Sequence, residues 1–535
     1  MPHADKRSFY IDLALFICAL LALYAIGIFS RSIWFDEAIT VQSFGAMPLT
    51  VPGSGFVDIA MFKPSLEGTT TLPKVIEHYI NVDIHPPLYF TVAHFATLVF
   101  GTNLYVVRFV SAALILLSVL IYARSLRRLE EPRIWTYLMV YGFSFAAATT
   151  AQDARGYAMA VLLSMAAWHV LLLMAQKTAV QRRIPLQLDI LLGVLCGSML
   201  LTHYFALLAA IPLLGWRFLS GLWRRDIRCF VGPLVAIALF LPWLPFMLDH
   251  FGNRPNQMNG FLGVFEWIKR MAQFSPGLIF SITSPDVPFG MQSVVRRIVL
   301  LLLIIGTVRA LWPAKEMTPR RVYGLIAVWV PAVGLLLFLA VSILMNRWFD
   351  TLRYLLFYAP FIIYLAALGA LTLADGLAKL RPGRLAMAPV AVLIFAEVAM
   401  LNFGWEANRN RGGNYFNTWA NDVLQTGTDE SLVIIDVGIA YGNLLGAAYT
   451  LPPDTQAYLL DYDQATWTTA AKEIAPALDG KNLVVLAFTI DRGDIGDDKV
   501  ALYGPVVKAL EENGFVRAES EPDPLGQRFY AKWER

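Results

Sequence analysis

Long apolar segments separated by short charged loops dominate this chain of 535 residues. The first runs from Phe9 to Phe29, and several others exceed the ~18 residues that a membrane-spanning helix requires. Residues of the hydrophobic set make up 57% of the chain and charged residues only 16%, whereas soluble domains carry roughly 25% charged residues. The sequence therefore predicts a polytopic α-helical membrane protein in contact with membrane lipids.

The first apolar segment is longer than the core of a secretory signal and lacks a small-residue cleavage site, so we expect a retained anchor. Cys18, Cys196 and Cys229 lie in or beside predicted spans without metal-ligand spacing, which indicates no disulfide framework. The net charge of +3 is spread among the loops, and we expect no nucleic-acid partner.

Loops rich in Lys and Arg alternate with loops that are nearly free of Lys, and this alternation orients the chain. Placing the basic loops in the cytoplasm gives about eleven spans, with the N-terminus inside and the C-terminus outside. The apolar segment 85–100 is an exception, because it has only about 16 residues and opens with His85-Pro86-Pro87. We therefore expect an interfacial or re-entrant helix there, within one long outer loop over residues 30–104.

The pattern changes at the end of the chain. Short β-type runs alternate with helical patterns; the runs are 432–435 and 483–488, and the helical patterns are 465–478 and 500–513. We expect a transmembrane module over 1–403, including the outer loop, and a small extracytoplasmic α/β domain over 404–535. Residues 408–413 form the predicted linker. The pattern Gly438–Gly442 lacks the third glycine of a dinucleotide loop and predicts a plain turn.

Ionisable residues collect at the predicted outer ends of the spans. Two adjacent carboxylates, Asp36 and Glu37, follow directly after the first span. Other polar residues fall at the same predicted interface; they are Asp83, His85, Arg108, Asp153, Arg155, His203 and Arg353. Charged groups at that depth usually face a bundle interior or a water-filled cavity. We therefore expect these residues to form the wall of a single site.

Each motif also has a structural explanation that the residues alone leave open. The carboxylate pair suits the first turn of a helix, and Asp83 with His85 fits a helix cap before two prolines. The charged segment Gln152–Tyr157 is also typical of an ordinary polar turn between two helices. His203 is also typical of a histidine that is hydrogen-bonded within a helical hairpin.

The residues alone also leave open what the arginines do and whether the site binds a metal ion. One arginine at the end of a span fits a snorkelling anchor. The planar guanidinium also matches phosphate oxygens, so Arg108, Arg155 and Arg353 around one pocket predict a bound phosphate. The sequence contains no spacing of metal-ligand residues that requires a cofactor. A divalent cation could still be held by three candidate ligands, which are Glu37, Asp153 and His203.

Taken together, the motifs resemble those of the GT-C superfamily of membrane glycosyltransferases, which use polyprenyl-phosphate-linked sugars. The similarity is to the bacterial branch related to protein O-mannosyltransferases and the lipid A aminoarabinose transferase. It covers residues 8–403 and rests on the order and spacing of Trp34–Glu37, Asp83–Tyr89, Arg108, Asp153–Tyr157, Thr202–Tyr204 and Arg353–Leu355.

This sequence departs from the family pattern in three places. The stretch before Gln152 lacks a proline that is common in relatives, Asp153 stands where Glu is frequent, and Gly156 replaces a bulkier residue. These departures concern the substrate rather than the reaction class.

The resemblance implies an inverting sugar transfer on the periplasmic side of a bacterial inner membrane, where the C-terminal domain would also lie. Asp36 would be the general base for an acceptor hydroxyl. Arg108, Arg155 and Arg353 would bind the phosphate of an undecaprenyl- or decaprenyl-type donor. The acceptor would be lipid A, lipopolysaccharide, another cell-envelope glycan or a protein. Substrate-orienting roles would fall to Glu37, Asp83, His85, Asp153, Arg155, Tyr157 and His203.

Two other functions remain open from the sequence. A lipid or glycolipid transporter or flippase would also need many spans and buried charges, but transporters usually place charges near the midplane and often show two related halves. An O-antigen polymerase or ligase would be expected to carry Arg and His in a large late outer loop, whereas 249–290 has no histidine beyond His250. We therefore rank the glycosyltransferase ahead of both.

Overall fold

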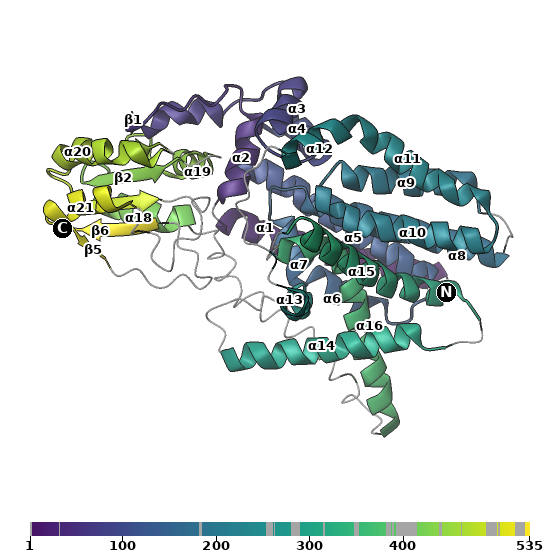
Figure 1. Cartoon of the computed structure of the whole chain (residues 1–535). Coiled ribbons are helices and arrows are strands. Elements are labelled where there is room, and N and C mark those ends of the chain that lie inside the picture. Colours follow the sequence, from purple (N-terminus) through teal and green to yellow (C-terminus); the bar gives the residue numbers. More distant parts are fainter. Residues whose placement is uncertain are drawn as a thin grey trace. The chain divides into compact units, whose positions relative to one another are not determined.

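The computed structural model (Figure 1) gives the chain a predominantly helical fold with a small sheet near its C-terminus. The described residues are 3–31, 33–180, 184–252, 261, 263–279, 289–313, 316–346, 352–380, 387, 390, 391, 415–437, 441–461, 463–487, 500, 503–518 and 530–535. The predicted linker 408–413 and the first three residues of Gly438–Gly442 lie outside them.

The chain packs into two compact units, which are considered separately. The first comprises Met1–Ile28, Ile84–Tyr89 and Arg108–Ala407. The second comprises Phe29–Asp83, Phe90–Val107 and Asn408–Arg535.

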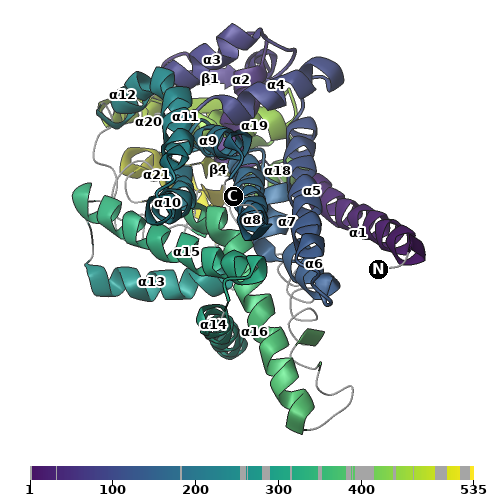
Figure 2. The same ribbon diagram turned by 90° about the vertical axis from the view of Figure 1, so that its right-hand side faces the viewer.

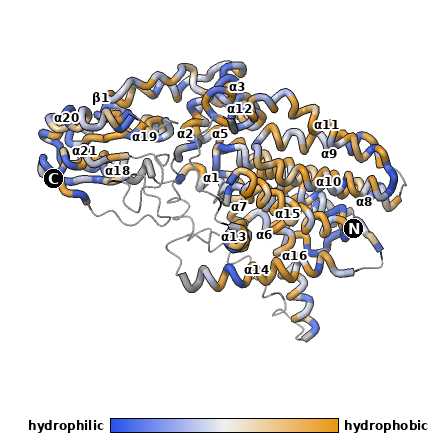
Figure 3. The backbone as a smooth tube through the Cα atoms, viewed as in Figure 1, coloured by the Kyte–Doolittle hydropathy of each residue, from blue (hydrophilic) through white to orange (hydrophobic). Residues whose placement is uncertain are grey.

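The first unit is a helical bundle. Its described helices are α1 (His3–Ser30), α5 (Leu104–Arg128), α6 (Ile134–Gly142), α7 (Phe145–Ala151), α8 (Tyr157–Val180), α9 (Leu186–Leu200), α10 (Leu207–Trp223), α11 (Val231–Phe240), α12 (Leu244–Gly252), α13 (Val264–Gly277), α14 (Phe289–Leu311), α15 (Pro319–Leu344) and α16 (Ala359–Leu380). Figure 3 shows that apolar residues line most of them. Short 3₁₀ turns lie between some of these helices, among them η2 (Tyr204–Ala206), η3 (Ile227–Phe230) and η5 (Leu352–Tyr358).

Seven segments within the described residues are long and apolar enough to cross a membrane. They are Arg7–Ser30, Leu104–Arg128, Tyr157–Val180, Tyr204–Trp223, Ile227–His250, Pro319–Leu344 and Arg353–Lys379. The prediction of a polytopic helical membrane protein is thus confirmed. The last of the roughly eleven predicted spans falls largely after residue 391, outside the described residues. Helix α4 (Leu88–Phe100) has 13 residues, fewer than the ~20 that a crossing needs, as the sequence predicts.

Close approaches between backbones fix the helix packing in the first unit. A Cβ atom at Gly306 of α14 would overlap the carbonyl of Leu365 on α16, and one at Gly369 would overlap the carbonyl of Leu302. Figures 1 and 2 show a second pair, α9 and α11, side by side. Small residues at helix crossings are typical of membrane bundles, because they let the two backbones come close.

The break between α6 and α7 needs no proline. The Ser144 side chain accepts a hydrogen bond from the Ala147 backbone N–H at 3.2 Å and so caps the start of α7. This cap marks the start of α7, which ends at Ala151, directly before Gln152.

The second unit contains a six-stranded sheet in the order β1-β3-β2-β4-β6-β5. The strands are β1 (Gly55–Asp58), β2 (Ser431–Asp436), β3 (Gln456–Leu460), β4 (Leu483–Ala487), β5 (Val516–Arg517) and β6 (Tyr530–Glu534). β2 runs parallel to both β3 and β4, and β1 runs antiparallel to β3. The near-continuous apolar runs of β2 and β4 are buried, as parallel strands covered on both faces require. The predicted C-terminal α/β domain is therefore present.

Helices from the first loop and from the C-terminal part of the chain complete this unit. They are α2 (Phe35–Phe44), η1 (Ile59–Ser65), α3 (Leu72–Asn81), α4, α18 (Tyr415–Thr426), α19 (Gly442–Thr450), α20 (Trp467–Ala477) and α21 (Gly504–Glu512). α19 packs against both α2 and η1. We expected residues 30–104 to belong to the membrane module. Most of this loop instead groups with the C-terminal domain, because β1 joins the sheet edge and α2 rests on α19.

Candidate active site

The segment that begins with His85 is anchored to the end of α9 in the first unit. The Leu88 backbone N–H donates to the Leu201 carbonyl at 2.9 Å, just where α4 starts after its two prolines. His85 itself is half-buried. This backbone bond places His85 beside the turn that carries His203, whose ring centroid lies 5.4 Å from that of His85.

Arg155 contacts the same histidine. Its Nη2 lies 2.8 Å from Nδ1 and 3.1 Å from Nε2 of His85. Because a guanidinium can only donate, the His85 nitrogen that accepts the bond must be unprotonated. The Arg155 side chain is only 2% exposed, so its positive charge is held within the protein next to His85.

His203 forms the centre of an aromatic cluster. Its Nδ1 accepts a hydrogen bond from the Phe205 backbone N–H at 3.1 Å and caps η2, which leaves the ring proton on Nε2. The rings of Tyr157 and Phe357 lie 5.1 and 5.2 Å from it, and that of Tyr354 lies at 6.4 Å. Two predicted residues, Tyr157 and His203, thus meet here, although the phenylalanines were not predicted.

Gly156 explains how these segments come so close. A Cβ atom at this position would lie 3.0 Å from the Thr202 carbonyl oxygen and 3.5 Å from Cβ of Tyr89. The loop after α7 is therefore pressed against the turn that holds His203. The glycine that departs from the family pattern has a packing role in this chain.

A hydrogen-bonded chain holds the backbone of Asp153. The Ser111 hydroxyl donates to the Asp153 carbonyl at 2.6 Å and lies 2.8 Å from the Tyr89 hydroxyl. Since the single Ser111 proton is committed to Asp153, Tyr89 donates to Ser111. The half-buried Asp153 side chain is therefore set on a fixed backbone.

The two remaining predicted arginines differ in their surroundings. Arg108 is fully buried, and its Nη1 donates to the Ile28 carbonyl at 2.9 Å, near the end of α1. Arg353 is half-buried, and its guanidinium carbon lies 5.9 Å from the ring centroid of Tyr354, which also contacts Phe205. Arg353 therefore adjoins the aromatic cluster, whereas Arg108 supports the backbone of a helix end.

The other predicted residues belong to the second unit. Asp36 is half-buried in the first turn of α2. Glu37 is fully buried, and its Oε2 accepts from the Trp34 backbone N–H at 3.3 Å, the reciprocal bond of a capping box. Asp83 is buried, and its backbone N–H donates to the His78 carbonyl at 3.1 Å. Glu37 therefore makes the helix-capping contact that the structural explanation expects, while the Asp36 residue keeps partial exposure.

Metal binding gains no support from the described geometry. Among the residues that the structure describes, no three His, Cys, Asp or Glu side chains gather closely enough to hold a metal ion. The candidates Glu37, Asp153 and His203 therefore stay a prediction.

Sequence reasoning missed a second polar network beside His203. The Trp243 indole N–H donates to the Tyr204 hydroxyl at 3.0 Å, and that hydroxyl lies 3.0 Å from Nδ1 of His250. The Tyr204 hydroxyl therefore links the side chains of Trp243 and His250. In the sequence, only the position of Tyr204 next to His203 points to this network. Its partners lie about 40 residues further along the chain.

The helical bundle and the α/β unit define a multi-span membrane protein with a small sheet near its C-terminus. Residues 84–246 match the family model described as dolichyl-phosphate-mannose-protein mannosyltransferase. This segment holds most of the motifs behind the predicted resemblance, from His85 to His203. Comparison with curated proteins gives no sequence match.

Two solved structures share the fold over nearly the whole chain. One is ArnT from Cupriavidus metallidurans in the apo state, with a TM-score of 0.53, 13% identity and 98% of each chain covered. The other is ArnT from the same organism bound to undecaprenyl phosphate, with a TM-score of 0.52, 13% identity and 97% of each chain covered. The family match and the shared fold agree with the predicted resemblance to mannosyltransferases and to ArnT.

Proposed function

We propose that this protein is an inverting glycosyltransferase that moves a sugar from a polyprenyl-phosphate donor to an acceptor outside the cytoplasm. The membrane would be the bacterial inner membrane. The acceptor would be lipid A, lipopolysaccharide or another cell-envelope glycan. The similar ArnT structure that holds undecaprenyl phosphate supports a donor of this chemical class.

The observation that carries the proposal is the clustering of His85, Arg155, Tyr157 and His203 within the segment matched by the mannosyltransferase family model. These residues come from three segments, around positions 85, 155–157 and 203, that are far apart in sequence. A buried guanidinium beside two histidine rings suits an anionic phosphate with a polar sugar attached.

In the proposed reaction, an acceptor hydroxyl attacks the anomeric carbon of the donor sugar. The carboxylate of Asp36 takes the hydroxyl proton as the new carbon–oxygen bond forms. The bond from the anomeric carbon to the phosphate oxygen breaks on the opposite face, and the polyprenyl phosphate leaves with the electron pair. One base and a stabilised leaving group suffice, because inversion needs no nucleophilic carboxylate.

The arginines stabilise the leaving phosphate in this proposal. Arg155 contacts His85 and Arg353 contacts Tyr354. The rings of His85 and Tyr354 lie 5.4 and 6.4 Å from that of His203. Arg108 has a fully buried side chain bonded to the end of α1, so we assign it a supporting role in addition to its predicted phosphate contact. Asp153, His85, Tyr157 and His203 orient the sugar, together with Glu37 and Asp83.

The decisive test compares wild-type protein with Asp36→Asn in the transfer of labelled sugar from polyprenyl-phosphate donors to an envelope-glycan fraction. We expect the wild type to transfer sugar and the folded, membrane-inserted Asp36→Asn variant to be inactive. Asp479→Asn, an exposed aspartate in the C-terminal domain, is the matched control and should be fully active. Equal activity of Asp36→Asn and wild type would refute the base assignment. Donor-lipid movement without sugar transfer would favour a transporter.

A further inference from the structure

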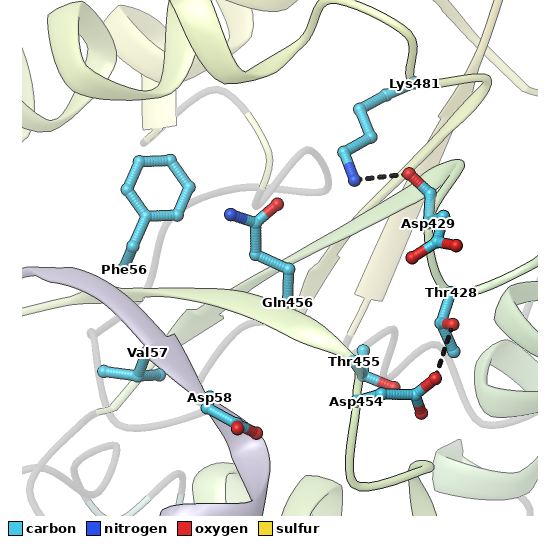
Figure 4. Close-up of a pocket in the computed structure, with 9 residues that line it drawn as sticks. All are labelled: Phe56, Val57, Asp58, Thr428, Asp429, Asp454, Thr455, Gln456 and Lys481. Atoms are coloured by element: carbon cyan, nitrogen blue, oxygen red, sulfur yellow. Dashed lines mark hydrogen bonds between the residues drawn. The ribbon is translucent and has the colours of Figure 1, made fainter.

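A pocket of about 470 Å³ lies in the second unit, at the edge where β1 joins the sheet (Figure 4). It is lined by residues of β1, by the start of β3 and by the loops that precede β2 and β4. Its volume falls within the roughly 300–1,000 Å³ typical of small-molecule sites. The lining includes none of the residues assigned to sugar transfer.

The pairing of β1 with β3 puts an aromatic ring and polar groups on one face. Asp58 pairs with Gln456 and Phe56 pairs with Tyr458, and residues two apart on a strand share a face. Figure 4 shows the Gln456 amide between Phe56 and Lys481. The Phe56 side chain is 39% exposed, and its ring packs edge-on against Tyr458 with centroids 4.9 Å apart.

Several polar groups of the lining are fixed in place, and others are available to a ligand. The Lys481 ammonium donates to the Asp429 carbonyl, and the Thr428 hydroxyl donates to Asp454. In the part of the chain that the structure describes, the Asp429 carboxylate and the Gln456 amide make no hydrogen bond. A ligand with closely spaced donors and acceptors could therefore bind them without breaking internal bonds.

A buried hydroxyl in the same wall gives independent support. The Thr455 side chain is fully buried, and its Oγ1 has no hydrogen-bond partner among the described residues. Buried hydroxyls are nearly always hydrogen-bonded. The Thr455 hydroxyl is therefore a polar group of the pocket wall that the described part of the chain leaves unpaired.

The charge of the lining selects the ligand class. The three carboxylates of Asp58, Asp429 and Asp454 outnumber the single ammonium of Lys481, so phosphates and uronic acids would be repelled. Carboxylates and an amide pair well with neighbouring hydroxyls, and an exposed aromatic ring offers an apolar surface to the C–H face of a sugar ring. We infer that this pocket binds an uncharged oligosaccharide, as a site separate from the one that transfers sugar.

The inference goes beyond the proposed function, because such binding needs neither the donor lipid nor the Asp36 carboxylate. It can therefore be tested on the full-length Asp36→Asn protein in lipid nanodiscs, with no donor present. Saturation-transfer NMR would measure binding of maltohexaose, mannohexaose and xylohexaose. Hexagalacturonate and hexalysine, of the same length, serve as anionic and cationic comparators.

We expect at least one uncharged hexasaccharide to bind, and Gln456→Ala or Phe56→Ala to weaken its binding about fivefold, as loss of one good contact implies. Gln425→Ala and Phe265→Ala, which remove exposed residues of the same types outside the pocket, should leave binding unchanged. Thermal melting checks that each variant is folded, and Gln456→Ala removes an exposed side chain that the sheet does not need.

Three results would overturn the inference. The first is that none of the uncharged hexasaccharides binds. The second is binding that both pocket variants retain at wild-type strength. The third is tighter binding of hexagalacturonate or hexalysine than of every uncharged probe. None of these results bears on sugar transfer, so failure here leaves the proposed function standing.

Discussion

Nη2 of Arg155 lies 2.8 Å from Nδ1 of His85, although 70 residues separate them in sequence. Arg155 follows α7 and His85 precedes α4, and a backbone bond from Leu88 to Leu201 joins the His85 segment to the turn of His203. The pair joins two motifs of the proposed site by a direct contact. It also holds a guanidinium in an orientation that a point charge could not reproduce.

Arg155→Lys should therefore lower sugar transfer although the positive charge is kept. We expect a loss of about tenfold to hundredfold in kcat/KM, the range for a lost hydrogen bond to a charged group, with a higher KM for the donor lipid. Arg124→Lys, at an exposed position on α5, is the matched control and should be active. Equal kinetics for both variants would exclude the proposed phosphate role of Arg155.

Substitutions of Glu37 and of its neighbour Asp36 should have different effects on sugar transfer. Glu37 caps α2 through the Trp34 N–H, and a glutamine oxygen can accept the same bond. Glu37→Gln should therefore stay folded and active, whereas Glu37→Ala should lose about 1 kcal/mol of stability. Melting curves and transfer rates of the two variants check this. An inactive but stable Glu37→Gln protein would point to Glu37, rather than Asp36, as the base.

The sequence allowed the clustering of His85, Arg155 and His203 to be predicted, because loop charges alone place all three at the same ends of the spans. It did not reveal which side chains touch, since that depends on backbone bonds between distant segments. It also could not distinguish a catalytic from a capping role for Glu37, because both suit a helix start. The bond from the Trp34 N–H to Glu37 shows a capping contact, and the Glu37→Gln variant tests the role of the carboxylate.

The grouping of the first loop with the C-terminal domain was beyond sequence reasoning. β1 has only four residues, Gly55–Asp58, and its burial alternates weakly between half-buried and exposed. Such a short edge strand carries little pattern of its own and is defined by its partner. Its partner β3 begins at Gln456, about 400 residues later, so no local signal connects them.

Gly156→Ala should test whether the tight approach to Thr202 matters. The added Cβ would lie 3.0 Å from the Thr202 carbonyl, and overpacking of this kind costs about 1–3 kcal/mol. We expect a lower melting temperature and reduced transfer, because the His203 turn must shift. Gly215→Ala on α10 meets nothing within 4 Å and should be neutral or stabilising by up to about 1 kcal/mol. Similar behaviour of both variants would contradict this role.

A buried ion network should dominate the stability of the α9–α10 region. Arg217 is 2% exposed and bonds Asp189 at 2.7 Å and Asp226 at 2.7 Å. Removing one partner leaves a buried charge uncompensated, so Asp189→Ala should cost about 3–5 kcal/mol. The more exposed pair Arg133–Asp375 is the comparison, and Asp375→Ala should cost at most about 1 kcal/mol. Thermal unfolding in one detergent measures both, and equal losses would refute the argument.

The protonation of His94 on α4 should lower the stability of the folded protein at acid pH. The side chain is 2% exposed, its ring stacks on Phe44, and its Nδ1 has no hydrogen-bond partner within the described residues. Burial lowers the pKa of His94 from its usual 6.5, because the charged ring is poorly solvated there. The stabilising contribution is therefore fully present above the unfolded pKa and is lost as the pH falls below 6.5 toward the folded pKa.

His94→Phe keeps the stacking surface and removes the titrating group. Melting temperatures measured from pH 8 to pH 5 should therefore fall more steeply for the wild type than for the variant. The two curves should converge in slope above pH 7, where His94 is uncharged in both folded and unfolded chains. Parallel curves over the whole range would mean that the protonation of His94 does not contribute to the packing of α2 on α4.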